Sequence, residues 1–236
     1  MIPLNNARLL IIAPHPDDEV LGCGGLISRI KSAGGKIYIL FLTLGTTSDY
    51  SARGSSTVSM RRKEILQVMN LLKVDDYDIA FPGDKYHLKL DSLPSRDIIE
   101  AIETKSKVSL KKVAPTIIAS TQFSDYNQDH RAAAASTIAA TRPAPPKLKT
   151  FVPLVLGYEF AANSWSVFNP QPLNFYVSLT KEDLDIKIKA MKYYTSQIRS
   201  GTHTRSAKTI EYLAKLRGAQ IGCFAAEVFY CYRFFL

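Results

Sequence analysis

The chain has 236 residues, of which 46% are hydrophobic and 22% charged, an ordinary balance for a globular protein. The formal net charge is +9, but the basic residues are spread along the chain without a nucleic-acid-binding motif, so we expect a solvated basic surface and no nucleic-acid partner. The sequence contains no run of about 18 apolar residues that would predict a membrane span. Its first residues lack the order of a signal peptide, so export is not predicted either. We therefore expect a cytoplasmic protein.

Apolar runs rich in β-branched residues alternate along the chain with segments of helical periodicity. The expected strands cover residues 8–13, 36–44, 78–82, 115–121, 151–158, 174–179 and 227–235. The expected helices cover residues 19–33, 59–73, 95–107, 129–141, 181–199 and 209–216. This order predicts an α/β, Rossmann-like fold whose mainly parallel sheet has helices on both faces. We find no internal repeat and no domain linker, so we expect a single domain over residues 1–236.

Polar side chains follow the first and the fourth expected strands. The first strand leads into Ala-Pro-His-Pro-Asp-Asp-Glu, which contains His15, Asp17 and Asp18, and Asp129 and His130 come shortly after the fourth strand. Open parallel sheets bind ligands at the carboxyl ends of their strands. Two histidines and a carboxylate are typical of a hydrolytic zinc site, where the metal acidifies water and polarises an amide carbonyl. Asp17, next to a ligand, is then the natural general base.

The same residues allow two other interpretations. A His-Pro-Asp-Asp segment also suits a helix N-terminus, because acidic residues interact favourably with the helix dipole. Spacing alone leaves this cap and the metal site open. Gly22 and Gly24 resemble part of a dinucleotide-binding fingerprint, but Ile27 occupies the place of its third glycine, and the preceding acidic residues would repel a pyrophosphate. We expect close helix–sheet packing at these glycines.

The segment around His15 resembles the signature of the LmbE-like (PIG-L) family. This family includes N-acetylglucosaminyl-phosphatidylinositol deacetylases and the deacetylases of mycothiol and bacillithiol biosynthesis. Further matches to the family follow in order along the chain: Arg61 with Glu64, Asp84, residues 128–131, residues 194–197, residues 217–218 and residues 226–229. The resemblance therefore covers the whole chain and implies a Rossmann-like fold and zinc-dependent N-deacetylation, with another divalent metal left open.

The resemblance also implies roles for single residues. By motif position, the metal ligands would be His15, Asp18 and His130. Asp17 would be the base that activates metal-bound water, and Asp129 would orient a neighbouring group. Arg61 and Asp84 would bind hydroxyl groups of the sugar, or an anionic substituent in the case of Arg61. A surface charge on a helix is the alternative for Arg61.

One position departs from the family pattern. Many members have a histidine three residues before the last ligand, where this chain has Asn127. An asparagine can donate a hydrogen bond to an oxyanion, but it cannot transfer a proton at neutral pH. We expect Asn127 to be the oxyanion donor. The general acid stays open between Asp17, which could return its proton, and His203, which could fold over the site. The alternative for His203 is a loop histidine without a role in catalysis. We interpret His87 as such a loop histidine.

Taken with these residues, the resemblance implies a metal-dependent hydrolase that removes the acetyl group from an N-acetylated amino sugar. The sugar would be of the N-acetylglucosamine type, in a glycoside, a glycoconjugate or a sugar nucleotide. Alternative substrates are a bacillithiol-like or mycothiol-like precursor and an antibiotic glycoside. Because of Asn127, a non-catalytic sugar-binding relative is a further alternative. The sequence leaves the aglycone open, and also whether the chain forms a homo-oligomer.

Overall fold

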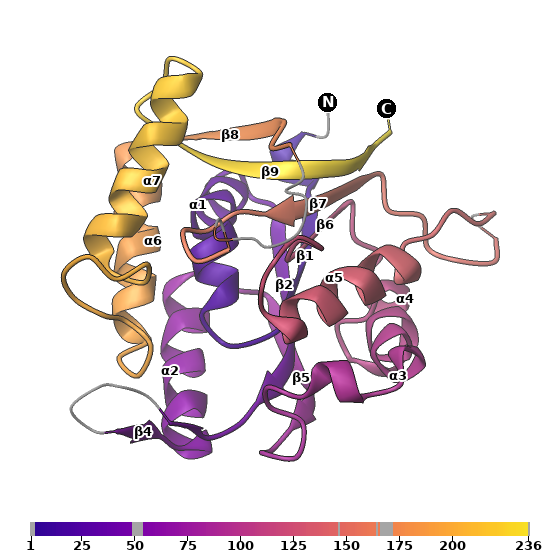
Figure 1. Ribbon diagram of the computed structural model, residues 1–236. Coiled ribbons are helices and arrows are strands. Elements are labelled where there is room, and N and C mark those ends of the chain that lie inside the picture. Colours follow the sequence, from indigo (N-terminus) through magenta and orange to yellow (C-terminus); the bar gives the residue numbers. More distant parts are fainter. Residues whose placement is uncertain (1–2, 49–53, 146, 164, 166–171, 236) are drawn as a thin grey trace.

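The computed structural model describes residues 3–48, 54–145, 147–163, 165 and 172–235. Its centre is a seven-stranded sheet in the order β5-β2-β1-β6-β7-β9-β8 (Figure 1). The strands of this sheet are β1 (Arg8–Ala13), β2 (Lys36–Leu44), β5 (Asp76–Pro82), β6 (Ile117–Ser120), β7 (Leu154–Tyr158), β8 (Phe175–Leu179) and β9 (Ala225–Phe234). A small antiparallel ribbon is formed by β3 (Thr47–Ser48) and β4 (Ser55–Ser56).

Most neighbouring strands of the large sheet are parallel. β1 pairs in parallel with both β2 and β6, β2 pairs with β5, and β6 pairs with β7. The last strand, β9, runs antiparallel between β7 and β8. The predicted mainly parallel, Rossmann-like fold is thus confirmed. Strand order reverses direction between β1 and β6, and such a switch point is where open α/β sheets bind their ligands.

Helices cover both faces of the sheet (Figure 1). They are α1 (Asp18–Ser32), α2 (Val58–Leu71), α3 (Ser95–Glu100), α4 (Leu110–Val113), α5 (Gln128–Ala140), α6 (Lys181–Tyr193) and α7 (Ala207–Gln220). The helix expected to reach residue 199 ends earlier, at Tyr193, because the following residues bind another helix. Thr195 and Ser196 both donate hydrogen bonds to the carboxylate of Glu64 on α2.

The apolar run of β1 is buried on both faces, which is typical of a central parallel strand. Leu9 and Ile11 belong to the core formed with α1, α2 and α6. Leu10 and Ile12 belong to a second core, formed with α3, α4 and α5. Packing on both sides fixes β1 and therefore also the loop that leaves it. In the described part of the chain, no helix is long and apolar enough to cross a membrane.

The glycines of α1 allow very close packing, as predicted. A side chain on Gly22 would collide with Tyr158 of β7, and one on Gly24 would collide with Lys187 of α6. At Gly25, a Cβ atom would lie 2.5 Å from Leu179 of β8. These close contacts explain the glycines without a dinucleotide-binding role. These contacts draw α1 against β7, β8 and α6, with its first turn at the switch point.

Candidate metal centre and active site

The residues after β1 and those at the start of α5 meet at the switch point of the sheet. β1 and β6 are hydrogen-bonded neighbours, so the loops at their carboxyl ends lie side by side. The first loop positions His15 and leads into Asp18, the first residue of α1. The second loop leads into α5, whose third residue is His130. His15 and His130, 115 positions apart in the sequence, therefore lie close together in the buried interior.

His15, Asp18 and His130 converge as a metal-ligand group would. Their ligand atoms all lie within 4.8 Å of one another, and all three side chains are buried. Oδ2 of Asp18 lies 3.3 Å from Nδ1 of His15 and 3.4 Å from Nε2 of His130. Two imidazole nitrogens and one carboxylate oxygen with room for water are a donor set that suits a catalytic divalent metal. The residues thus fit such an ion.

Each histidine is oriented by a carboxylate on its other nitrogen. Nε2 of His15 lies 2.9 Å from Oδ2 of Asp129, and Nδ1 of His130 lies 2.7 Å from Oδ2 of Asp125. Asp129 is itself fixed, because its Oδ1 accepts a hydrogen bond from the backbone N–H of Leu90. Such carboxylate partners set the tautomer and the ring orientation of metal-binding histidines.

The charges around this group favour a cation. Burial tends to lower the pKa of His130, but the negative charges of Asp18 and Asp125 and their hydrogen bonds raise it to about 10. The pKa of His15 is raised as well, because hydrogen bonds from its ring to Asp129 and Asp18 outweigh burial. Burial tends to raise the pKa of Asp18, but the two histidines hold it well below its usual range. A metal would supply the positive charge that protons supply in its absence.

Asp17 occupies the first position before α1 but does not cap it. Its φ of 122° and ψ of −28° are unusual for a residue with a side chain, and the carboxylate makes no capping hydrogen bond. Instead, Oδ2 of Asp17 accepts a hydrogen bond from Nη1 of Arg205 at 3.2 Å. The same Nη1 donates to Oε1 of Gln197 at 2.7 Å. The strained backbone aims Asp17 away from the helix, which disfavours the capping alternative.

Glu19 holds the backbone of Asp17 in this conformation. Oε2 of Glu19 accepts a hydrogen bond from the Asp17 N–H at 3.0 Å, and its Oε1 accepts one from the Tyr194 hydroxyl at 2.5 Å. Glu19 is fully buried, and this burial raises its pKa to about 8. Burial and the charge of Asp18 also raise the pKa of Asp17, against the opposing charge of Arg205. A base of raised pKa is better suited to accept a proton.

A cavity of about 580 Å³ opens over these residues. Its lining includes the three candidate ligands and Asp17, together with Arg61, Asn127 and His203. Seven residues were predicted as metal ligands, base or substrate residues. Six of them line this cavity, together with Asn127. The seventh is Asp84, which is not part of the lining. Its Oδ1 accepts a hydrogen bond from the Thr46 N–H at 2.5 Å and so holds the loop after β2.

Arg61 is buried in the cavity wall and is not a surface charge. Its Nη2 donates to the carbonyl oxygen of Pro16, and its Nη1 donates to Oγ1 of Thr47. His87 lies beside it, with Nε2 at 3.4 Å from Nη1, and its ring is 5.2 Å from that of His15. Burial and the charges of His15 and Arg61 lower the pKa of His87 to about 3. His87 is therefore neutral at pH 7.

Asn127 and His203 line different walls of the cavity. Oδ1 of Asn127 accepts a hydrogen bond from the Asp129 N–H and caps α5, so its amide nitrogen is the atom left to donate. His203 is exposed, and its Nδ1 accepts from the Arg205 N–H at 3.0 Å. Burial and the neighbouring Arg205 lower the pKa of His203. Contacts of either residue with a substrate stay a prediction.

Sequence reasoning missed three residues of this site. Arg205 gave no signal, because it lies 188 positions from Asp17 in a loop without periodicity. Asp125 stands five residues before His130, and the rule that metal-binding histidines have carboxylate partners could have found it. His87, interpreted as a loop histidine, is buried beside His15 because the short turn after β5 folds back toward β1.

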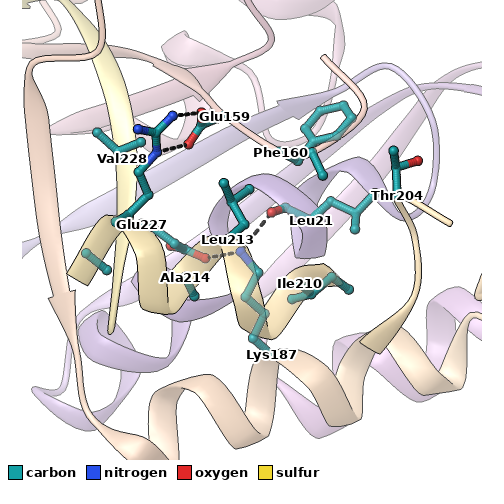
Figure 2. A pocket seen from close by; sticks show the side chains of 13 residues that line it. Leu21, Glu159, Phe160, Lys187, Thr204, Ile210, Leu213, Ala214, Glu227 and Val228 are labelled. Atoms are coloured by element: carbon teal, nitrogen blue, oxygen red, sulfur yellow. Dashed lines mark hydrogen bonds and ion pairs between the residues drawn. The ribbon is translucent and has the colours of Figure 1, made fainter. Parts of the chain in front are cut away.

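A second, much smaller cavity of about 20 Å³ is lined by residues of α1, α6, α7 and β9 (Figure 2). Lys187 of α6 crosses it and donates hydrogen bonds to Oε1 of Glu227 at 2.6 Å and to the carbonyl oxygen of Leu21 at 2.7 Å. Glu227 also accepts hydrogen bonds from the N–H groups of Gly25 and Leu26. At the same cavity, Arg217 pairs with Glu159. The buried ion pair of Lys187 and Glu227 ties α1 to α6 and β9.

The fold and the site together define a Rossmann-like α/β protein with a His–Asp–His candidate metal centre at its switch point. A family model described as "PIG-L: GlcNAc-PI de-N-acetylase" matches residues 10–141, more than half of the chain. The chain therefore belongs to this family. It is a member of a family of deacetylases, which are hydrolases that act on amide bonds.

Individual proteins agree with this placement. The chain is 27% identical over 190 residues to the uncharacterized deacetylase YaiS of Escherichia coli K12, covering 80% of this chain and 90% of that one. The N,N'-diacetylchitobiose deacetylase of Pyrococcus horikoshii has the same fold, with a TM-score of 0.69, 20% identity and coverage of 97% and 85%. A 4-carboxy-2-hydroxymuconate hydratase, GalB of Pseudomonas putida, also shares it, with a TM-score of 0.72, 19% identity and coverage of 96% of each chain. The fold alone therefore does not decide the reaction.

Proposed function

We propose that this chain is a zinc-dependent N-deacetylase that removes the acetyl group from an N-acetylated amino sugar of the N-acetylglucosamine type. One observation carries the proposal. Asp17 is held next to the buried His15, Asp18 and His130 group and opens into the same cavity. A base beside a metal-ligand group is what amide hydrolysis by activated water requires. Family membership supports the same reaction.

Each residue has a role in this reaction. His15, Asp18 and His130 would hold the metal, which when bound polarises the amide carbonyl and acidifies water. Asp17 takes the proton of the attacking water. Because Arg205 binds Oδ2 of Asp17, we assign the proton to Oδ1.

The remaining polar groups serve the substrate. The amide nitrogen of Asn127 donates a hydrogen bond to the oxyanion that forms from the acetyl carbonyl. Arg61 binds a hydroxyl group or an anionic substituent of the sugar. His203 closes the opposite wall. Asp84 does not line the cavity. Its proposed contribution to substrate binding is therefore indirect, through the loop after β2 that it holds.

The proton that the leaving amine needs comes from Asp17. Asn127 cannot supply it, because an amide does not ionise near pH 7. His87 has a pKa of about 3 and is neutral at that pH. Burial and the charge of Arg205 lower the pKa of His203, which disfavours it as a proton donor. The base that accepted the proton of water therefore returns it to the nitrogen, and the C–N bond breaks to give acetate and the free amino sugar.

A non-catalytic sugar-binding relative is the second candidate, favoured only by Asn127. The strained backbone of Asp17 argues against it, because a binding protein gains nothing from strain that aims a carboxylate at a metal site. A bacillithiol-like or mycothiol-like precursor and an antibiotic glycoside fit the same chemistry as substrates. We also propose a cytoplasmic enzyme, which the three free cysteines support.

Acetate release tests the proposed function. Zinc-loaded protein is incubated with free N-acetylglucosamine, its oligomers, UDP-linked N-acetylglucosamine and thiol-precursor glycosides. Asp17→Asn, with a metal content equal to that of the wild type, is the control. We expect release by the wild type and a decrease of about 10²- to 10⁴-fold in the variant. Release from none of these compounds by protein with stoichiometric zinc would refute the amino-sugar assignment.

A further inference from the structure

Three exposed residues with large side chains lie in or beside the lining of the large cavity. We call them the apolar lip: Leu88, Tyr126 and Trp165, which are 45%, 46% and 75% exposed. Leu88 and Tyr126 line the cavity itself. The floor of the same cavity consists of buried polar groups, among them His15 and Asp17. The cavity thus has a polar floor and an apolar stretch at Leu88 and Tyr126, while other exposed residues of its lining, Ser48, Ser200 and His203, are polar.

Tyr126 and Trp165 form an aromatic pair. Their ring centroids are 5.7 Å apart, and their planes are tilted by 43°. Tyr126 lines the cavity, whose floor is polar, and its ring also meets the ring of Trp165. The indole of Trp165 is mostly exposed and can stack on a ligand that extends beyond the floor.

Leu88 is kept at the lip in spite of backbone strain. Its φ is +58°, in the left-handed region where glycine and asparagine are the usual residues. The Gln128 side chain donates a hydrogen bond to its carbonyl oxygen at 3.1 Å, which holds the strained turn next to α5. A branched apolar side chain that is strained and exposed contributes little to the stability of the fold. Its position at a ligand cavity indicates a role in binding.

We propose that the apolar lip binds an apolar alkyl or aryl aglycone of an N-acetylated amino-sugar glycoside. The inference rests on the proposed function, which places the acetamide at the floor. Apolar contact suits the lip because Leu88 offers no hydrogen bond and the rings of Tyr126 and Trp165 present large apolar surfaces. The volume of about 580 Å³ leaves room for a ligand larger than one pyranose ring. The lip therefore selects glycosides by what the sugar is attached to.

The fluorescence of Trp165 tests this directly, because it is the only tryptophan of the chain. Zinc-loaded protein is titrated with methyl, hexyl and phenyl β-glycosides of N-acetylglucosamine and with N,N'-diacetylchitobiose. Burial of two methylene groups at the lip corresponds to about a tenfold gain in affinity. We expect the hexyl and phenyl glycosides to bind at least about tenfold more tightly than the methyl glycoside and to shift the emission.

Leu88→Asn separates binding from stability. Asparagine tolerates a positive φ, so we expect this variant to fold with an unchanged or higher Tm. It should lose the preference for hexyl over methyl glycoside, in affinity and in kcat/KM. The matched control is Leu66→Asn on α2, a leucine of similar exposure (51%) outside the cavity lining. The control should keep the preference.

The possible outcomes separate this inference from the proposed function. Equal affinity for all glycosides with unchanged Trp165 emission would overturn the role of the lip, even if acetate is released. Tighter binding of diacetylchitobiose than of the hexyl glycoside would also overturn it, and would assign the lip to a second sugar. Selective binding of the hexyl glycoside without acetate release would support the lip and refute deacetylation.

Discussion

Replacing Lys187 by methionine tests how α1, and with it the candidate metal centre, is held in place. Lys187 and Glu227 are 5% and 4% exposed, and their charged atoms lie 2.6 Å apart. Methionine keeps much of the length of the side chain but removes its charge. The carboxylate of Glu227 would then keep only the N–H groups of Gly25 and Leu26 as partners, and the carbonyl oxygen of Leu21 would lose the hydrogen bond from Lys187.

Removing one partner of a buried ion pair leaves an uncompensated charge and costs about 3–5 kcal/mol. For a chain of this size, about 2–4 °C of Tm corresponds to each kcal/mol, so we expect Tm to fall by roughly 6–20 °C. Glu227→Gln alone should have a similar effect. The double variant should lose clearly less than the sum of the two single variants, because it leaves no charge unpaired.

Urea unfolding followed by circular dichroism measures these free energies of unfolding. The matched control is Lys181→Met, which removes a pair with Asp185 whose side chains are 69% and 57% exposed. We expect a change below about 0.5 kcal/mol there. If Lys187→Met costs less than about 1 kcal/mol, or if the two single effects simply add, the buried ion pair does not hold α1 as argued.

Three further predictions concern the site. Arg205→Gln should lower kcat by about 10- to 100-fold, because a charge-assisted hydrogen bond is lost. It should also move the acidic limb of the pH profile of kcat/KM to higher pH, because the charge of Arg205 lowers the pKa of Asp17. An unchanged profile would contradict this. The pKa of Glu19, about 8 in the folded chain against an ordinary 4.5, means that its contribution to stability is complete below about pH 4.5 and is lost as the pH rises toward 8. Urea unfolding in EDTA should therefore show a decline over this range in the wild type that is weaker in Glu19→Gln, and parallel curves would be evidence against the raised pKa. Zinc binding at pH 7 should release at least one proton, from His130 with its pKa of about 10, measured by calorimetry in buffers of different ionisation enthalpy; heats that do not depend on the buffer would rule this out.

The sequence by itself determined the fold class and indicated which segments meet at the floor of the site. Its alternation of apolar strands and periodic helices is a local property, because burial on both faces requires a continuous apolar run such as that of β1. Residues at the carboxyl ends of two such strands must also meet at one edge of the sheet. The segments around His15 and His130 could therefore be expected to meet, whereas the choice of His15, Asp18 and His130 as metal ligands came from the family resemblance.

Only the tertiary structure decided what surrounds these residues. Arg205 reaches Asp17 across 188 positions, and Lys187 pairs with Glu227 across 40. Neither contact has a sequence period, because each depends on the packing of α6 and of the loop before α7 against α1. The strained turn of Leu88 is held by Gln128, 40 positions further along the chain, and the strained backbone of Asp17 is held by Glu19, whose carboxylate binds the distant Tyr194. Local patterns fix the backbone of the elements, whereas the direction in which a loop side chain points depends on which distant groups it meets.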